Sequence, residues 1–376
     1  MGYGLYDGLL DWFLNTFGLD DKIQPQLRST LLDSLEMTTI LLFLIVNTIM
    51  LIWLERKIWP RMMNMRGIAF VDFNWGHFFG KTWKFGFLQN IAEFLKFFSK
   101  EDIVPEKADK FPFNIGFFAF IVAPPFMLGA LLPLGGSAVI ADPAVGFLLI
   151  FAMFSLYPVG VLVTGWSSNN KYSLLGAFRS AAQLISYEIP LILSVGAVVI
   201  VTGSFSLVDI AQQQTRTPLG LPFMILMPIG FIVFMTSLAA ETERIPFDIP
   251  EAEAELVMGW RTELTGFRYM MSMATEYFIL LIGSFIGVSL FWGGSYLPFL
   301  EEFNNIVDSW PLFGAAIFTI KIWIFIFIYI WIRSALPRVR IDQLLDIGWK
   351  WLIPLALVNI IVVIAIFLFD SGFFGA

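Results

Sequence analysis

The sequence has 376 residues, of which 58% are hydrophobic and only 14% are charged. A soluble domain needs far less apolar material for its core, so we expect lipid to surround this chain. The sequence contains no Cys and a single His. It therefore excludes a cysteine-ligated iron–sulfur cluster, a bis-histidine haem and a Cys/His zinc site within this chain. Any electron transfer must rely on cofactors that a partner holds.

Stretches with few or no charged residues recur along the chain, each close to the roughly 20 residues that a helix needs to cross a hydrocarbon core. They lie near residues 38–54, 111–134, 144–166, 184–203, 219–240, 269–292, 312–332 and 351–369. A β-barrel would show alternating segments of about 10 residues instead. The sequence thus predicts an all-α polytopic membrane protein of about eight transmembrane helices, in a single membrane domain over residues 35–376.

Two amphipathic segments lie outside these spans. Residues 1–34 form a polar lead-in, with a short amphipathic helix expected at Leu5–Phe13. The long segment after the first span contains a second one at 87–98, where Phe87, Leu88, Ile91, Leu95 and Phe98 recur at helical spacing. The second helix either lies on the bilayer surface or roofs an opening from the membrane into the protein.

Basic residues are concentrated in alternate loops, which predicts the orientation of the chain. They are Arg56, Lys57, Arg61, Arg66, Lys81, Lys84, Lys96, Lys100, Lys107, Lys110, Lys171, Arg179, Arg244, Arg261, Arg268, Arg333, Arg338, Arg340 and Lys350. The positive-inside rule places these loops in the cytoplasm and both termini on the non-cytoplasmic side. The long first loop, with its amphipathic helix, is therefore cytoplasmic.

The segment from Glu241 to Glu263 is unusually acidic for a cytoplasmic loop of this chain. Its seven acids are Glu241, Glu243, Asp248, Glu251, Glu253, Glu255 and Glu263, against two arginines. One interpretation is structural, because acids after Pro250 suit the positive N-terminal end of a helix. The other is functional, because clustered carboxylates beside a bilayer repel one another and lose hydration, which raises their pKa and lets them exchange protons.

Ionisable residues also lie within the predicted spans, namely Glu188, Glu276 and Lys321. An ionised side chain at the centre of a membrane costs at least about 2.5 to 3.5 kcal/mol. We expect these residues to line a polar path that leads from the acidic loop. The alternative is that the glutamates pair with the lysine and hold the helices together.

Five ordered motifs resemble a known family. They are GFLQNIAEFLKFFSKEDIVP at 86–105, GWSSNNKYSLLGAFRSAAQLISYEIPL at 165–191, ETERIPFDIPEAEAELVMGWRTELTG at 241–266, ATEY at 274–277, and Lys321 followed by Arg333 in WIRSALPRVRIDQLL. With LERKI at 54–58, they resemble the membrane subunit of respiratory complex I that joins the hydrophilic arm to the proton-pumping arm. That family has an eight-span fold.

The resemblance implies two groups of functional residues. Residues matching Glu55, Arg56, Glu93 and Arg333 border a chamber that admits a quinone. Residues matching Glu188, Glu241, Arg244, Asp248, Glu251, Glu253, Glu255, Glu263 and Glu276 belong to an acidic funnel that links quinone reduction to proton movement, and we place Lys321 with this path. A quinone would be the substrate, and iron–sulfur clusters would lie in partner subunits.

One stretch departs from the family pattern. After ERK the family has a Gln, an Arg and Gly-Pro-Asn, whereas this chain has IWPRMMNMRG with Met63 and Met65 at the polar positions, and extra length. The quinone entrance or a subunit contact is expected to differ there, which points to a divergent, archaeal-type member.

The resemblance implies a subunit in the cell membrane of a prokaryote, in contact with the hydrophilic arm, small membrane subunits and antiporter-like subunits. Two alternatives remain at this point. One is the equivalent subunit of a membrane-bound hydrogenase or ferredoxin-linked complex. The other is a stand-alone ion transporter, which the lack of an internal repeat disfavours. The electron donor and the acceptor are determined by other components.

Overall fold

The computed structural model describes residues 25–65, 67, 87–128, 145–217, 221–249, 256–297, 304, 307 and 311–369. Within these ranges the chain is helical and contains no strand. The helices are α2 (Pro25–Met62), α4 (Phe87–Ser99), α5 (Lys110–Ile115), η2 (Gly116–Val122), α6 (Ala123–Leu128), α7 (Gly146–Phe154), α8 (Leu156–Ser167), α9 (Lys171–Thr202), α10 (Leu207–Gln213), η4 (Gln214–Arg216), α11 (Phe223–Leu226), α12 (Pro228–Glu241), η5 (Gly259–Arg261), α14 (Gly266–Phe291), α16 (Pro311–Ala335), α17 (Ile341–Asp346), η6 (Ile347–Leu352) and α18 (Ile353–Phe369).

The predicted class of an all-α polytopic membrane protein is confirmed. Among the described residues, five helices are long and apolar enough to cross a membrane: Gly146–Ser167, Lys171–Thr202, Gly266–Phe291, Phe313–Ala335 and Ile341–Phe369. The shorter α12 is also apolar, and the predicted spans near 38–54 and 111–134 fall on α2 and on α5 to α6. The number of eight crossings and the orientation of the termini stay predictions. The helix expected at Leu5–Phe13 lies outside the described residues.

Two helices extend well beyond the apolar stretches from which they were predicted. Helix α9 begins at Lys171, before the predicted span at 184, because Asn170 caps it by accepting a hydrogen bond from the backbone N–H of Tyr172 at 3.0 Å. Helix α2 continues past the apolar stretch to Met62. Polar helix ends of this kind carry charged residues, such as Glu55, next to the apolar core of the bundle.

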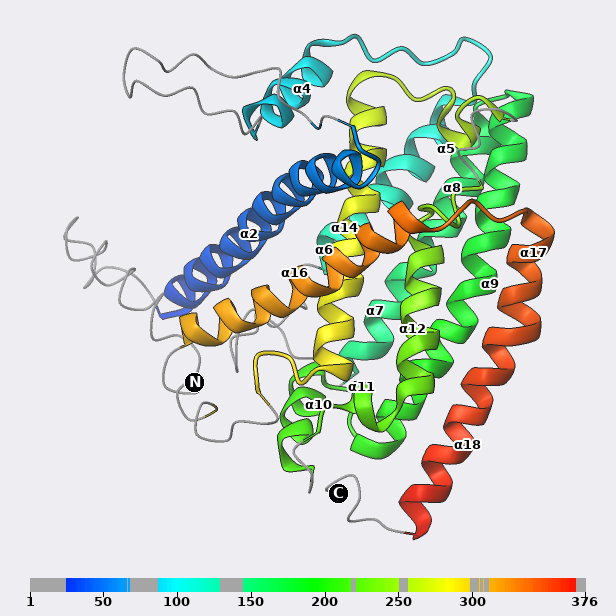
Figure 1. The fold of residues 1–376 in the computed structure, drawn as a ribbon. Helices are drawn as coiled ribbons and strands as arrows, with labels where there is room; N and C mark the ends of the chain where they lie inside the picture. The colour runs from blue at the N-terminus through cyan, green and yellow to red at the C-terminus, as the bar shows by residue number, and fades with distance from the viewer. Residues whose placement is uncertain are drawn as a thin grey trace.

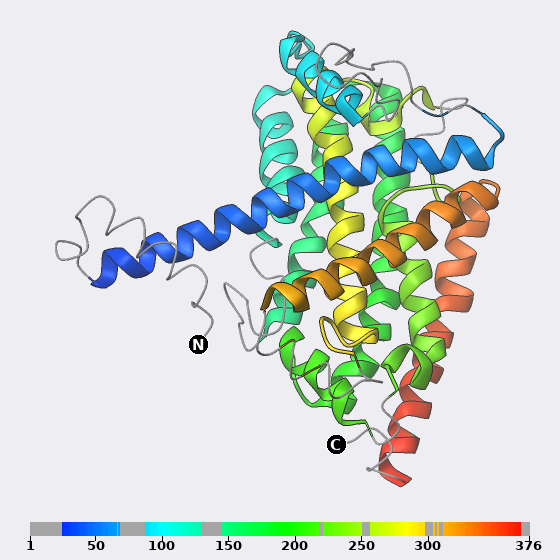
Figure 2. The ribbon, with the colours of Figure 1, turned by 60° about the vertical axis from the view of Figure 1, so that its left-hand side comes forward.

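The helices form an upright bundle that two oblique helices cross. Helices α8, α9, α12, α14 and α18 stand roughly parallel, whereas α2 and α16 lie side by side and strongly tilted across α14 in both views (Figures 1 and 2). Their C-terminal ends meet in the half of the molecule where α4 lies (Figure 1). Helix α14 is the centre of the bundle, since every residue from Phe278 to Phe291 is buried.

The amphipathic helix predicted at 87–98 is confirmed as α4. Its aromatic residues reach α14, where the ring of Phe97 lies 5.9 Å from that of Tyr269 and the ring of Phe98 lies 5.2 Å from that of Phe267. The apolar residues Ile91 and Leu95 are exposed. A helix that leaves apolar residues exposed on its outer side is suited to a lipid environment.

Candidate functional site

Glu55 is the hub of a buried ion network. Its side chain comes from α2, is 5% exposed, and accepts a hydrogen bond on Oε2 from Nη1 of Arg244 at 2.8 Å. Its other oxygen, Oε1, pairs with Nη1 of Arg333 at the end of α16. A carboxylate removed from water is stable only when cations and hydrogen-bond donors compensate it. Glu55 therefore ties together α2, α16 and the segment that follows α12.

Aromatic rings support both arginines of this network. The guanidinium of Arg244 lies 4.0 Å from the ring centre of Tyr277, and that of Arg333 lies 5.5 Å from the ring centre of Trp59. Cation–π contacts of this kind are stronger when water is excluded. The buried carboxylate of Glu55 thus contacts two arginines, and each of them also lies on an aromatic ring.

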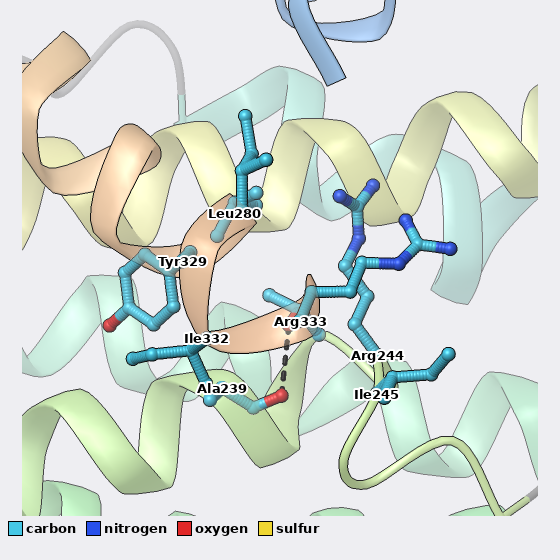
Figure 3. Close-up of a pocket in the computed structure, with 9 residues that line it drawn as sticks. Ala239, Arg244, Ile245, Leu280, Tyr329, Ile332 and Arg333 are labelled. Carbon is cyan, nitrogen blue, oxygen red and sulfur yellow. Dashed lines mark hydrogen bonds between the residues drawn. The ribbon is translucent and has the colours of Figure 1, made fainter. Parts of the chain in front are cut away.

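A small pocket adjoins these arginines. It is lined by Ala239, Thr242, Arg244, Ile245, Leu280, Tyr329, Ile330, Ile332 and Arg333. Figure 3 shows that the side chains of Arg244 and Arg333 extend to the same side of the pocket, while Leu280, Tyr329 and Ile332 form its other walls. The pocket thus combines apolar walls with a cationic end.

Arg56 and Glu93 form a second pair close to Glu55. Arg56 follows Glu55 on α2, and its Nη1 pairs with Oε2 of Glu93 on α4 and lies 3.5 Å from Oδ1 of Asn90. The two charged side chains are 40% and 35% exposed, so water screens the pair. The structure therefore brings the four predicted chamber residues together in two adjacent pairs, one buried and one at the surface.

A separate network surrounds Arg261, whose side chain is completely buried. Its Nη2 pairs with Oε1 of Glu276 on α14 and lies 3.7 Å from Oε2 of Glu243. Glu243 also accepts a hydrogen bond from the hydroxyl of Ser180 on α9. Glu241, the last residue of α12, is 1% exposed and is an electrostatic neighbour of Glu243. Two buried acids thus share one arginine, and a third lies beside them.

A close helix contact delivers Arg261 to this position. The short helix η5 packs against α9, where a Cβ on Gly176 would come within 2.5 Å of the Cα of Gly259, so a larger side chain does not fit. Ser173 of α9 donates to the carbonyl of Trp260 at 3.2 Å. Gln183, also on α9, donates to the carbonyls of Ala240 and Phe247, both at 2.8 Å. Helix α9 therefore holds both sides of the acidic segment.

The remaining predicted residues are more dispersed. Glu188 is half-buried on α9 and is an electrostatic neighbour of Glu241. Glu263 accepts from Asn170 at the start of α9, and Asp248 pairs with Arg338 at 2.9 Å. Arg244, predicted to belong to the funnel, pairs with Glu55, which was predicted to border the chamber. Glu251, Glu253 and Glu255 lie outside the described residues, as does the helix expected to begin at Pro250.

Lys321 stands apart from the acids. Its Nζ donates to the backbone carbonyls of Trp292 at 2.8 Å, Gly294 at 2.9 Å and Tyr296. These carbonyls follow the C-terminal end of α14, whereas Glu276 lies in its first half and pairs with Arg261. The alternative in which Lys321 pairs with the intramembrane glutamates is therefore wrong. Its assignment to a proton path stays a prediction.

Sequence reasoning missed the roles of Arg261, Glu243 and Ser180 in this network. Arg261 was named only as one of the basic residues of the cytoplasmic loops, and Glu243 only as one acid of the segment from Glu241 to Glu263. Ser180 had no distinguishing signal. The small residues of SLLGAFRS at 173–180 indicate that another backbone approaches α9 there, and this pattern was the available clue.

Fold and site together define a polytopic membrane protein with charged networks buried in one half of its helical bundle. A family model described as NADH dehydrogenase matches residues 35–364. The chain therefore belongs to the NADH dehydrogenase family, and its resemblance to the membrane subunit of respiratory complex I is confirmed. It is a complex I-type membrane subunit, part of a multisubunit oxidoreductase complex.

Proposed function

We propose that this chain is the quinone-chamber subunit of a proton-translocating oxidoreductase, in which it joins the redox arm to the pumping arm. The observation that carries the proposal is the position of Arg244 and Arg333 beside the small pocket, both held by Glu55. The apolar walls suit the hydrophobic part of a quinone. The arginines suit its polar head, because they can donate to a carbonyl oxygen that gains negative charge on reduction.

The pair of Arg56 and Glu93 supports an approach to the chamber from the membrane. It links α2 to α4, whose exposed Ile91 and Leu95 suit lipid contact. A quinone diffusing along the bilayer would meet this partly exposed pair before it reached the buried Glu55. Its low burial also lets the pair separate and re-form at small energetic cost.

The network around Arg261 supports the proposed coupling. Reduction of a quinone to the quinol consumes two electrons and two protons, so charge must move close to the reacting head. Glu243 and Glu276 share one buried arginine with Glu241 beside them, and a change of charge nearby alters how protons are distributed among such coupled acids. Glu188, on α9, adds a further acid to this group. Together with Asp248, Glu251, Glu253, Glu255 and Glu263, these residues would form the proton path.

The proposal requires partners. Because the chain has no Cys, electrons would come from iron–sulfur clusters in a neighbouring subunit of the hydrophilic arm on the cytoplasmic face. Protons would cross through antiporter-like subunits in the membrane, with small membrane subunits between. The assembly would reside in the cell membrane of a prokaryote.

The test uses the native complex and the variant Glu93→Gln. We expect quinone reduction to fall several-fold while electron transfer to an artificial, water-soluble acceptor is unchanged, because that acceptor takes electrons upstream of the chamber. Glu106→Gln is the matched control, since Glu106 is an exposed acid on the segment that follows α4. Equal loss of both activities in the assembled complex would contradict a role in the chamber.

Purification of the native complex tests the wider proposal. Co-purification with a hydrogenase subunit, and a turnover that needs no quinone, would favour the hydrogenase-type assembly. Proton transport by this chain alone in liposomes would favour a stand-alone transporter. Co-purification with iron–sulfur and antiporter-like subunits, together with quinone reductase activity, is the expected result.

A further inference from the structure

The carbonyl oxygens around Lys321 form a compact set of ligands for a cation. An ammonium group has three N–H donors, and here each is used by a carbonyl, those of Trp292, Gly294 and Tyr296. The residue is 4% exposed, and the partners of Nζ among the described residues are these three carbonyls. A buried positive charge is thus balanced by backbone dipoles alone in the part of the chain that the structure describes.

The backbone of residues 292–296 is shaped so that these oxygens converge. Gly293 and Gly294 have φ values of 73° and 58°, in the left-handed region that other residues rarely adopt. The N–H groups of Trp292 and Gly294 both donate to the carbonyl of Val288 at 3.0 Å, and that of Tyr296 donates to Gly293 at 2.9 Å. The segment curls back on the end of α14 and is itself hydrogen-bonded.

The physical setting favours a cation at this point. The C-terminal end of a helix carries partial negative charge from its unpaired carbonyls, and α14 ends at Phe291. The ring of Trp292 lies 5.9 Å from Nζ and adds the attraction of its π-face. Backbone carbonyls that replace the hydration shell of a monovalent cation are also the ligands of potassium-selective filters.

We propose that the carbonyls of residues 292–296 form a binding site for a monovalent cation and that the ammonium group of Lys321 occupies this site. This contact fixes α16 to the end of α14. Helix α16 crosses α14 in both views (Figures 1 and 2). It is then held at two points, by Lys321 and by Arg333, which lie about 18 Å apart at 1.5 Å of helix per residue. Lys321 is a positioning residue, and the site is independent of the proposed quinone chamber.

The test separates the positive charge from the space that the side chain fills. Lys321→Ala removes both and leaves room for a small amine, whereas Lys321→Met keeps most of the stem but supplies no donor. In the purified complex, both variants should show at least ten-fold faster amide hydrogen exchange in peptides covering residues 286–297. n-Butylammonium should restore slow exchange in Lys321→Ala but not in Lys321→Met.

Two probes and one variant serve as controls. n-Butanol has a similar shape without the charge, and tetramethylammonium has the charge without N–H donors, so neither should restore protection. Lys350→Met should leave exchange in 286–297 unchanged, because Lys350 is exposed and pairs with Asp346. If Lys321→Ala prevents assembly, the same compounds are added during growth, and recovery of the complex by n-butylammonium alone is expected.

Unchanged exchange in Lys321→Met would overturn the proposal, as would equal rescue of Lys321→Ala by n-butanol, or failure of n-butylammonium to restore either exchange or assembly. Quinone reductase activity is not the readout. A wrong assignment of the chamber would therefore leave this result unaffected.

Discussion

Arg244 and Arg333 are far apart in the sequence, yet their guanidinium groups bind the two oxygens of one carboxylate, that of Glu55. One arginine follows α12 and the other lies near the end of α16, while the carboxylate belongs to α2. The side chains of Arg244 and Glu55 are only 10% and 5% exposed. The charge of a single side chain therefore joins the two oblique helices to the segment that follows α12.

Removal of that charge should destabilise the subunit strongly. Glu55→Gln removes the carboxylate that both arginines contact, and the loss of one partner from a buried ion pair typically costs about 3 to 5 kcal/mol. The double variant Glu55→Gln with Arg333→Met should be more stable than the single variant Glu55→Gln, because it also removes one of the two cations that this carboxylate contacts. Denaturant-induced dissociation of the subunit from the complex measures both. Additive losses would show that Glu55 and Arg333 do not depend on one another.

The pair of Arg56 and Glu93 should behave differently, because its side chains are more than one-third exposed. Each single charge reversal, Arg56→Glu or Glu93→Arg, should change stability by no more than about 1 kcal/mol. Each should nevertheless slow quinone reduction several-fold by making like charges face each other between α2 and α4. The double reversal should recover most of the rate, as measured by steady-state quinone reductase activity. A double variant as slow as the singles would show that the residues act separately.

The fold was largely predictable because lipid imposes a simple rule on the sequence. A segment that crosses a membrane must be apolar over about 20 residues, so charge-free stretches such as 351–369 mark helices directly. The ends of helices were less predictable. Helix α9 begins well before its apolar stretch because Asn170 provides a cap, and α2 runs past the charged residues near Glu55. Hydropathy marks only the apolar part of each helix, so it does not indicate where these two helices begin or end.

The site was predictable in its composition but only partly in its pairing. Charges within the spans are rare in such a chain, so Glu188, Glu276 and Lys321 could be identified individually. Which cation meets which acid depends on helix tilt and rotation, and these properties are not encoded in local sequence. The pairing of Arg244 with Glu55 was therefore not predicted, and Lys321 was considered as a partner for glutamates although it binds carbonyls.

Arg261 should be essential for assembly, because it compensates Glu243 and Glu276 inside the bundle. Arg261→Met would remove the cation that contacts both acids, so we expect little or no assembled complex on a native gel. Adding Glu276→Gln should restore part of the assembly, because it removes one of the two buried acids that Arg261 contacts. Arg338→Met is the matched control, since its side chain is 42% exposed and it should assemble normally. Normal assembly of Arg261→Met would contradict the structural interpretation of this network.

Glu188 tests whether the acids act in coupling rather than in folding. It is half-buried on α9 beside Glu241, so Glu188→Gln keeps the shape of the side chain and removes its ability to hold and release a proton. We expect the complex to assemble and to reduce quinone, but to move fewer protons per electron in proteoliposomes. Glu253→Gln should act in the same way if it belongs to the same path.

The measurement is the proton-to-electron ratio from simultaneous records of internal pH and quinone reduction. Asp346→Asn is the control, because Asp346 is an exposed acid paired with Lys350 and its loss should leave the ratio unchanged. A ratio in Glu188→Gln equal to that of the unmodified complex would exclude Glu188 from the proton path and leave it a structural residue of α9.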